Sequence, residues 1–483
     1  MEDIYVTNSI INLGDSYKYS HASQYPNNMI SMYSYMESRG GVYPATIFVG
    51  LQYYLKAYLT TPITAEDIMN AVHKAALHGI PFDRAGWEHI LKEHKGFLPI
   101  RIKAVKEGSL VPTNHVLLTI ESTDDTVPWI AGFVETLLMK IWYPTTVATK
   151  SYYVRKMLER YGSSEWAKFA YHNFGDRGAP SVEAAAIGGF AHLSQFMGTD
   201  NFNALNFCEE YYNVPNNEIA GYSVFATEHS TTTSYGRDGE EQFVYNQLLA
   251  NPDAPIMSFV ADSYDVYNFV HFCTDRGSRI RLLIESRPHQ KFVIRPDSGN
   301  PIEVINRIMN IMKLNNLSIL PTANGTILFK DFAILWGDGI TPKTIEDILS
   351  INLTNGFAAE NFVFGSGGDL MQNVTRDTQK FAIKCSNITV EEKPGVHYVD
   401  AHGYDRYTYP KLKDIDVYKD PITDPGKTSK KGKVTTYINT DTGAYVKGLR
   451  GTVPENCVEA LIPVFKNGVI LNTISLVDIR NNA

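Results

Sequence analysis

Side chains that could bind a phosphorylated sugar follow five successive apolar runs of the sequence. Arginine and glycine amides bind phosphate, and aspartates bind hydroxyl groups or Mg²⁺. The residues at the ends of these runs are His229; Asp262 and Asp265; Arg295 and Asp297; Gly337, Asp338 and Gly339; and Gly365, Ser366, Gly367 and Gly368. Phe174, followed by Arg177, could stack on a flat ring. These residue types predict a site for a phosphorylated sugar.

Each of these features also has an ordinary structural interpretation. A single histidine after a strand is more often structural, and the PDSG segment at 296–299 favours a type I turn. The GSGG segment at 365–368 would let backbone N–H groups converge on an anion. It lacks the GK[ST] ending of a P-loop and does not match GxGxxG, so neither a Walker nor a Rossmann site is supported. The prediction rests on the combination, because none of the five ends carries a bulky apolar residue.

The apolar runs themselves predict a parallel sheet. They are Phe169–Tyr171, Tyr222–Ala226, Ile256–Val260, Phe292–Ile294, Phe332–Leu335 and Phe362–Phe364. Their spacing is about 30–55 residues, against roughly 30 per unit in a (β/α)₈ barrel. A further short unit near Gly198–Asp200 would fill the widest gap. Barrels and doubly wound sheets share this rhythm, and both gather ligands at the carboxyl ends of strands.

The two ends of the chain have a different organisation. Helical patterns are predicted at Ala45–Thr60, Ala65–His78 and Trp129–Trp142, and strands at Pro99–Lys106 and His115–Glu121. Residues Asn387–Lys419 have little periodicity, and we interpret them as an excursion loop. A basic, turn-rich segment follows at Asp420–Lys433, and the tail Val434–Ile479 returns to short strands.

Composition limits the class of protein. The 483 residues are 44% apolar and 20% charged, which is typical of a globular enzyme. A net charge of −8 argues against bulk nucleic-acid binding, and no apolar run is long enough for a membrane span. The N-terminus does not read as a secretory signal, and the four cysteines are widely spaced without a CxxC pair. We therefore expect reduced thiols and a cytoplasmic protein.

Ordered motifs along the whole chain then carry a family resemblance. They are DSYKYSHASQYP (15–26), PIRIKAVKEGSLVP (99–112), HNFGDRG (172–178), GTD (198–200), GYSVFATEHST (221–231), DSYDVYN (262–268), IRPDSGNP (294–301), GDG (337–339), FGSGGDLMQNVTRD (364–377), KCS (384–386) and KDPITDPGKTSKKG (419–432). On these motifs the chain resembles the nicotinamide phosphoribosyltransferase family, of the type II phosphoribosyltransferases. The resemblance implies a pentosyltransferase of NAD salvage, which joins nicotinamide to phosphoribosyl pyrophosphate and releases nicotinamide mononucleotide and pyrophosphate.

The resemblance also implies an architecture. It is a homodimer with active sites at the subunit interface. Each chain has an irregular α/β barrel and a second, discontinuous α+β domain. We place the barrel at residues 150–385 and the second domain at residues 1–149 together with 386–483.

Carried over residue by residue, the resemblance assigns the base-binding end of the site. Phe174 would stack on one face of nicotinamide, and Tyr17 of the partner subunit would cover the other. Asp200 would accept a hydrogen bond from the carboxamide. His229 matches the histidine that family members phosphorylate when ATP hydrolysis is coupled to the reaction.

The remaining implied roles concern the ribose and the phosphates. Nearby carboxylates, Asp297 and Asp262, would stabilise an oxocarbenium-like transition state, and they are possible Mg²⁺ ligands. The other implied substrate-binding residues are Arg177 and Arg295 for the substrate and its phosphates; Gly337 and Asp338 with Asp297 for the ribose; Gly368 and Arg376 on the 5′-phosphate side; Gly367, with no separate role; and Arg39, Lys384 and the lysines of 427–431 for the phosphate or ATP side.

Departures from the family pattern leave alternatives open. Asp176 and Asp369 stand where an aromatic residue and a glycine are common, and a carboxylate at Asp369 would weaken phosphate binding unless it points away or meets a lysine. The region after Arg39 is short, and the 387–419 excursion is long. One alternative is a nicotinate phosphoribosyltransferase, in which a cation in place of Asp200 would be needed to bind the carboxylate of nicotinate. Another is a non-catalytic binding or signalling role on the same fold.

Overall fold

The computed structural model describes residues 9–424 and 427–483 and divides the chain into two compact units. The first unit comprises Met1–Thr149, Tyr211–Asn213 and Thr375–Ala483, and the second comprises Lys150–Glu210 and Val214–Val374. The chain passes from the first to the second within helix α6 (Trp142–Leu158). Within the described residues, no helix has the length and apolar character that a membrane crossing needs.

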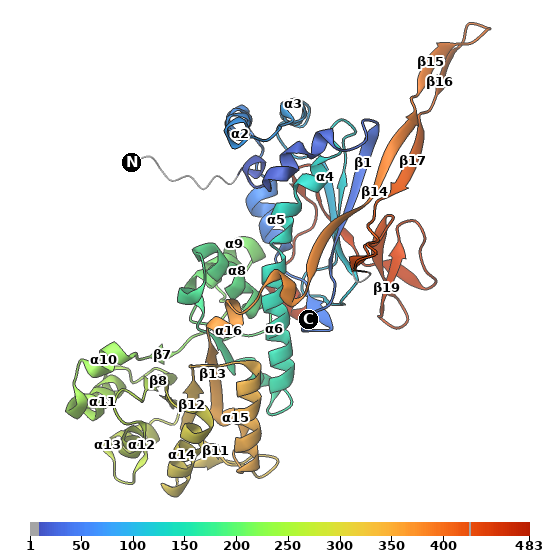
Figure 1. The fold of residues 1–483 in the computed structure, drawn as a ribbon. Coiled ribbons are helices and arrows are strands. Elements are labelled where there is room, and N and C mark those ends of the chain that lie inside the picture. The colour runs from blue at the N-terminus through green and yellow to red at the C-terminus, as the bar shows by residue number, and fades with distance from the viewer. Residues whose placement is uncertain (1–8, 425–426) are drawn as a thin grey trace. The chain divides into compact units, whose positions relative to one another are not determined.

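A six-stranded parallel sheet forms the centre of the second unit (Figure 1). Its order is β6 (Tyr171–Asn173), β13 (Phe362–Ser366), β12 (Phe332–Trp336), β9 (Lys291–Arg295), β8 (Ile256–Val260) and β7 (Phe225–Ala226). The strands are nearly continuous apolar runs because helices cover a parallel sheet and bury it. Phe259 and Phe292, on neighbouring strands, stack with ring centroids 4.7 Å apart.

Isolated backbone bridges link the two edges of this sheet. Asn173 pairs in parallel with Thr199, and Gly198 pairs with Tyr222, three residues before β7. The short unit predicted near Gly198–Asp200 is therefore present, and the sheet curls into an irregular barrel. This decides between the barrel and the open doubly wound sheet.

The helices of the second unit begin where short polar side chains cap them. At the start of α14 (Pro301–Leu314), the Asn300 side chain accepts from the amides of Ile302 and Glu303. At the start of α15 (Pro342–Thr354), the Thr341 side chain accepts from the amide of Thr344. The longer helices of this unit are α8 (Val182–Leu193), α9 (Phe202–Tyr212), α11 (Glu240–Ala250), α12 (Val266–Thr274), α13 (Arg279–Glu285), α14 (Pro301–Leu314) and α15 (Pro342–Thr354).

The first unit is built on a seven-stranded sheet whose pairings are antiparallel. The order is β17 (Lys411–Asp416), β14 (Phe381–Lys393), β1 (Met29–Ser38), β5 (Val116–Ser122), β3 (Ile100–Ala104), β21 (Ile462–Lys466) and β22 (Val469–Ile470). The predicted strands at 99–106 and 115–121 are β3 and β5. Helices α2 (Ala65–His78), α3 (Arg84–Glu93), α4 (Ile130–Phe133), α5 (Glu135–Met139) and α17 (Leu476–Asn482) belong to the same unit.

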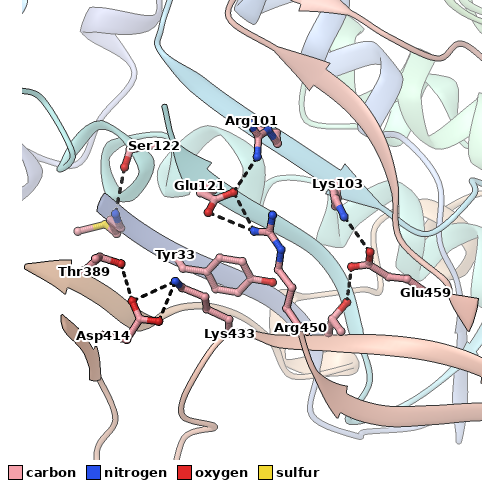
Figure 2. Close-up of polar contacts among 12 residues, drawn as sticks. Tyr33, Arg101, Lys103, Glu121, Ser122, Thr389, Asp414, Lys433, Arg450 and Glu459 are labelled. Carbon is pink, nitrogen blue, oxygen red and sulfur yellow. Dashed lines mark hydrogen bonds and ion pairs between the residues drawn. The ribbon is translucent and has the colours of Figure 1, made fainter. Parts of the chain in front are cut away.

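Ion pairs join a smaller sheet to this large one. The small sheet contains β19 (Tyr445–Leu449), β18 (Val434–Asn439) and β20 (Cys457–Glu459). Figure 2 shows Glu121 on β5 between Arg101, at 3.3 Å, and Arg450, at 3.0 Å. Lys103 on β3 contacts Glu459 on β20 at 2.7 Å. These contacts hold the C-terminal strands against the sheet that carries β1 and β14.

The prediction of a loop at 387–419 is wrong. Strand β14 continues to Lys393, and β15 (Val396–Val399) and β16 (Asp405–Thr408) form a hairpin that leads into β17. The hairpin extends well beyond the sheet (Figure 1). Its turn is closed by Asp400, whose carboxylate accepts from the amides of His402 and Tyr404. Both faces of β15 and β16 are exposed, so the alternation of apolar and polar residues that marks a half-buried strand is missing.

Two other boundaries differ from the sequence-based expectation. The helix expected at 45–60 begins only at Leu51, because Ala45–Ile47 forms strand β2 against β4 (Leu110–Pro112). Gly50 makes the turn between β2 and the helix that begins at Leu51, with φ of 100°. A Cβ at this position would lie 2.4 Å from Pro144. The sequence predicts that the barrel ends at 385, whereas the second unit ends at Val374, because β14 pairs with β1 from Phe381 onward.

Candidate active site

A cavity of about 1170 Å³ lies at the carboxyl ends of the parallel strands in the second unit. Of the predicted substrate-binding residues, it is lined by Phe174, Arg177, Asp200, Arg295, Asp297, Gly337, Asp338, Gly367 and Gly368. The structure therefore brings together residues that are up to 194 positions apart in the sequence. Asp176 and Asp369, the departures from the family pattern, line it as well.

Glycines make room for the Phe174 ring. A Cβ on Gly365 would lie 2.0 Å from that ring, and one on Gly337 would lie 3.5 Å from it. The ring packs against the buried cluster of Val293, Ala333 and Leu335. The Phe174 amide donates to the carbonyl of Ser366 at 2.9 Å. Phe174 is therefore a fixed, partly buried aromatic platform in the cavity wall.

The glycine loop at 365–368 is held to the segment that carries Phe174. Gln372 donates from Nε2 to the carbonyl of Gly175 at 3.0 Å, and its amide donates to the carbonyl of Gly368 at 3.0 Å. The Asp369 carboxylate does not face a phosphate unopposed, because Lys150 Nζ lies 2.5 Å from its Oδ2. The carboxylate at Asp369 therefore meets a lysine, the condition under which it need not weaken phosphate binding.

Arg295 supplies a buried donor at the end of β9. Its Nε is buried and has no acceptor among the described residues. A buried guanidinium nitrogen without a partner carries a desolvation cost that a phosphate oxygen would relieve. Asp297 follows two residues later, and its Oδ1 lies 3.2 Å from the position that a Cβ on Gly337 would take. A side chain at 337 would therefore press on this carboxylate.

Hydrogen bonds to two neighbouring residues position Asp200. Its amide donates to the carbonyl of Asn173 at 3.0 Å, and Ser223 Oγ donates to its Oδ1 at 2.7 Å. The nearby His172 is buried, and burial lowers its pKa while the Asp200 charge opposes that shift. Asp200 thus presents an oriented carboxylate to the cavity.

His229 and Asp262 form a pair with Ser298. His229 Nε2 lies 3.1 Å from Asp262 Oδ1, and Ser298 Oγ donates to Asp262 Oδ2 at 2.5 Å. His229 is the first residue of α10 (His229–Thr233) and its side chain is 47% exposed, while that of Asp262 is 8% exposed. When Nε2–H donates to the carboxylate, the neutral imidazole carries its free lone pair on Nδ1. Neither residue lines the cavity, although Ala226, Thr227 and Glu228 just before His229 do.

Sequence reasoning missed one further carboxyl group in this region. Glu240, at the start of α11, is buried, and its Oε1 has no hydrogen-bond partner within the described part of the chain. Burial raises its pKa to about 7, Arg237 lowers it, and Asp265 and Asp262 raise it further. Asp265, which the sequence suggested as a chemical group, instead caps α12 through the amides of Tyr267 and Asn268.

A second cavity, of about 550 Å³, lies in the first unit and is rich in cations. Its charged lining residues are Arg39, Arg376, Lys380, Lys384, Lys419 and Lys427, with Glu135, Asp377 and Asp424. Burial lowers the pKa of Lys384, Glu135 opposes this, and Arg39, Lys419 and Lys18 lower it further. Arg39 Nη2 is buried without an acceptor among the described residues. The arrangement suits a polyanion.

The other implied residues of the first unit lie elsewhere. Lys430 pairs with Glu37, and the Lys431 ammonium lies 5.1 Å from the centroid of the Tyr418 ring. Residues 425–426 of the basic segment are outside the described residues. Tyr17 is 58% exposed on the 3₁₀ helix Ser16–Ser23, with its ring centroid 5.0 Å from that of His21.

Comparison with known proteins identifies the family. The model of the Nicotinate phosphoribosyltransferase (NAPRTase) family matches residues 169–398, and that of the "Nicotinamide phosphoribosyltransferase, N-terminal domain" matches residues 9–102. A nicotinamide phosphoribosyltransferase of Xanthomonas campestris pv. campestris is 40% identical over 490 residues, covering 99% of this chain and 98% of that protein. One of Acinetobacter baylyi is 27% identical, with coverage of 97% and 96%.

Solved structures share the fold at low sequence identity. Nicotinate-nucleotide pyrophosphorylase from Pyrococcus furiosus has a TM-score of 0.59 and 13% identity, covering 100% of this chain and 97% of that one. Human nicotinic acid phosphoribosyltransferase has a TM-score of 0.57 and 14% identity, with coverage of 98% and 93%. The match to the Xanthomonas protein over nearly all of both chains is decisive, and the chain belongs to the nicotinamide phosphoribosyltransferase family.

Proposed function

We propose that this protein transfers the 5-phosphoribosyl group from phosphoribosyl pyrophosphate to nicotinamide. The pyridine nitrogen bonds to C1 of the ribose while the bond from C1 to the pyrophosphate oxygen breaks. The products are nicotinamide mononucleotide and pyrophosphate. The observation that carries the proposal is the cavity of the second unit, where an aromatic platform, an oriented carboxylate and an arginine whose buried Nε has no acceptor among the described residues meet at the strand ends.

The residues divide between the base and the sugar phosphate. Phe174 orients the pyridine ring, and Asp200 accepts the N–H of its carboxamide. Neutral nicotinamide is a weak nucleophile, so holding it in line with C1 is the main contribution of this end. Arg295 and Arg177 bind phosphate, and Asp297 stabilises positive charge that develops on the ribose. Gly367 and Gly368, which have no side chains, allow the 5′-phosphate to approach the backbone.

Among the carboxylates of this region, Asp297 suits a Mg²⁺ ion better than Asp262 does. Both oxygens of Asp262 are already engaged, by His229 and Ser298, whereas Asp297 and Asp338 line the cavity. We propose that Asp297 and Asp338 would hold Mg²⁺ together with substrate oxygens. When bound, the ion would neutralise charge on the departing pyrophosphate.

We further propose that ATP stimulates the reaction by phosphorylating His229. The Asp262 carboxylate holds Nε2–H, which directs the lone pair to Nδ1 as the nucleophile. The bond from the γ-phosphorus to its bridging oxygen would break, ADP would leave, and a phosphorus–nitrogen bond would form. The cationic cavity of the first unit, lined by Arg39, Arg376 and Lys384, supports binding of the polyphosphates.

A homodimer with shared sites and a cytoplasmic location complete the proposal. The exposed side chain of Tyr17 supports the homodimer, because a surface aromatic ring suits a contact with nicotinamide bound in the cavity of a second subunit. Tyr17→Ala and His229→Ala chains should then restore ATP-stimulated activity to one another when subunits exchange. The widely spaced cysteines, without a CxxC pair, support the cytoplasmic location.

The experiment that tests the reaction compares three incubations of the purified protein with phosphoribosyl pyrophosphate and Mg²⁺. One contains nicotinamide, one contains nicotinate and one contains no base. We expect mononucleotide from nicotinamide at a rate several hundred times that from nicotinate. Turnover of nicotinate alone would favour the acid-specific alternative, and no product in any incubation would favour a non-catalytic role.

A further inference from the structure

Two histidines and an aspartate converge in the first unit, away from the two cavities described. His89 Nε2 lies 3.0 Å from Asp124 Oδ2, and His94 Nε2 lies 2.6 Å from the same oxygen. All three atoms lie within 4.8 Å of one another. Among the described residues, this is the one group of three histidine, cysteine or acidic side chains close enough to share an ion. None of the three residues lines either the barrel cavity or the cationic cavity.

The backbone fixes each member of this cluster. His89 is on α3, and His94 caps its C-terminus, with its amide donating to the carbonyl of Ile90. The chain then turns through Lys95 at φ of 55° and Gly96 at φ of 84°, and a Cβ on Gly96 would lie 2.3 Å from the carbonyl oxygen of Ile63. His94 is thus held at a rigid helix end.

Asp124 is equally constrained, on the turn that follows β5. The amide of Thr123 donates to the carbonyl of Pro99 at 2.9 Å, and Thr123 Oγ1 donates to Asn467. The amide of Thr126 donates to Asp124 Oδ1 at 2.7 Å, which leaves Oδ2 for the histidines. In metal sites a ligating carboxylate is typically held in place by such a hydrogen bond to its other oxygen.

We propose that His89, His94 and Asp124 bind a divalent transition-metal ion, for which Zn²⁺ is the best match. Two imidazole nitrogens and one carboxylate oxygen, with a fourth position open to solvent, are a usual zinc donor set. At zinc bond lengths of about 2.0–2.2 Å in tetrahedral geometry, ligand atoms are roughly 3.3–3.5 Å apart. The present separations of 3.0 and 2.6 Å need to widen by less than 1 Å, which side-chain rotation provides.

The site is accessible to ions in solution and distinct from the transferase chemistry. The three side chains are 25%, 21% and 14% exposed, so a solvated ion can reach them without opening the fold. The ion would join the end of α3 to the turn after β5. The proposal does not depend on the reaction assigned to the barrel.

The test is titration of chelator-treated, full-length protein with ZnCl₂ and, separately, with CoCl₂. Calorimetry should give one equivalent of Zn²⁺, and Co²⁺ should give visible d–d absorption of a low-coordinate site. His89→Phe and His94→Phe should each weaken Zn²⁺ binding by more than roughly 10–100-fold, which is the cost of losing a residue that only hydrogen-bonds to a ligand. His271→Phe is the matched control, because His271 pairs with Asp275 at 3.0 Å but belongs to no such cluster.

A measurement on the unmodified chain covers the case in which a variant fails to fold. Zn²⁺ should protect His89 and His94 from carbethoxylation by diethyl pyrocarbonate, read by peptide mass spectrometry, and should leave His271 reactive. Binding that is equal in the His89→Phe, His94→Phe and parent proteins would overturn the proposal. So would the absence of a bound equivalent together with unchanged reactivity of both histidines.

Discussion

The ammonium group of Lys150 lies 2.5 Å from the Asp369 carboxylate, beside the glycine loop of the barrel cavity, and it also donates to the Asp369 carbonyl at 2.5 Å. The two side chains are 8% and 12% exposed. Lys150 is on α6 and Asp369 is on the short helix α16 (Gly368–Met371), so the pair joins the end of the glycine loop to α6. Its partners neutralise each other, which removes the repulsion that a lone carboxylate would exert on phosphate.

Removing only one partner of this pair should therefore harm phosphate binding. Lys150→Met leaves a buried carboxylate unpaired, a change that typically costs about 3–5 kcal/mol, and should raise KM for phosphoribosyl pyrophosphate. Lys150→Met combined with Asp369→Asn should recover much of the loss. A double-mutant cycle on KM and on the free energy of unfolding measures the coupling, which we expect within about 0.5–3 kcal/mol. Additive effects of the two substitutions would mean that the pair does not act as a unit.

Asp200 should select nicotinamide over nicotinate. A charge-assisted bond to the carboxamide contributes roughly 1.5–3 kcal/mol, and nicotinate would add repulsion between carboxylates. We expect discrimination on the order of 3–4 kcal/mol, a factor of several hundred. Asp200→Asn should shift the ratio of kcat/KM toward nicotinate.

Ser223→Ala is the matched control for that experiment. It removes the hydroxyl that orients Asp200 but keeps the charge, so overall efficiency should fall while nicotinamide remains preferred. If the ratio for Asp200→Asn equals that of the parent, Asp200 is not the selector, and Asp176 on the same cavity wall becomes the next residue to vary.

His229→Ala should abolish ATP hydrolysis and the stimulation of synthesis by ATP. Synthesis without ATP should persist, because Phe174, Asp200 and Arg295 remain in place. Phosphate release and mononucleotide formation are measured in parallel, with His271→Ala as a control at a histidine–aspartate pair outside the site. ATP turnover that survives in His229→Ala would return this histidine to a structural role.

Glu240 should make stability depend on pH near neutrality. Its folded pKa of about 7 exceeds the ordinary value of 4.5, so between these values the folded chain holds a proton that the unfolded chain has lost. Stability from this group is present below about pH 4.5 and is lost as pH rises through 7.

Glu240→Gln should remove this part of the pH dependence. Urea unfolding from pH 5 to 8 should show a smaller decline in the free energy of unfolding for the variant than for the parent. Glu241→Gln, at the neighbouring residue that pairs with Arg279, should keep the decline of the parent. Identical pH profiles for Glu240→Gln and the parent would contradict the raised pKa.

The parts of the molecule that the sequence predicted well are those fixed by local pattern. Runs such as Met257–Val260 and Phe332–Leu335 are buried on both faces, so apolar continuity and the polar residue that follows both mark the strand and its end. Because parallel strands end at one edge, the sequence predicts Arg295, Gly337 and Gly368 at one site, and all three line the barrel cavity.

Other features depend on contacts that no local pattern contains. Lys150 meets Asp369 across 219 positions, and Ser298 meets Asp262 across 36. The buried state of Glu240 depends on how α11 packs, and its sequence context, a glutamate near a helix start, indicates an exposed residue. The hairpin at β15 and β16 escaped prediction because both faces of these strands are exposed, so no apolar side alternates with a polar one along them.

The most direct test of the central claim is the rate of nicotinamide mononucleotide formation against nicotinamide concentration, for the parent and for Phe174→Leu. Aromatic contacts contribute about 0.5–1.5 kcal/mol beyond buried area, so kcat/KM for nicotinamide should fall by roughly 2- to 13-fold in the variant. KM for phosphoribosyl pyrophosphate should change far less. A parent protein that forms no mononucleotide from nicotinamide, or a variant with unchanged kcat/KM for the base, would contradict the account.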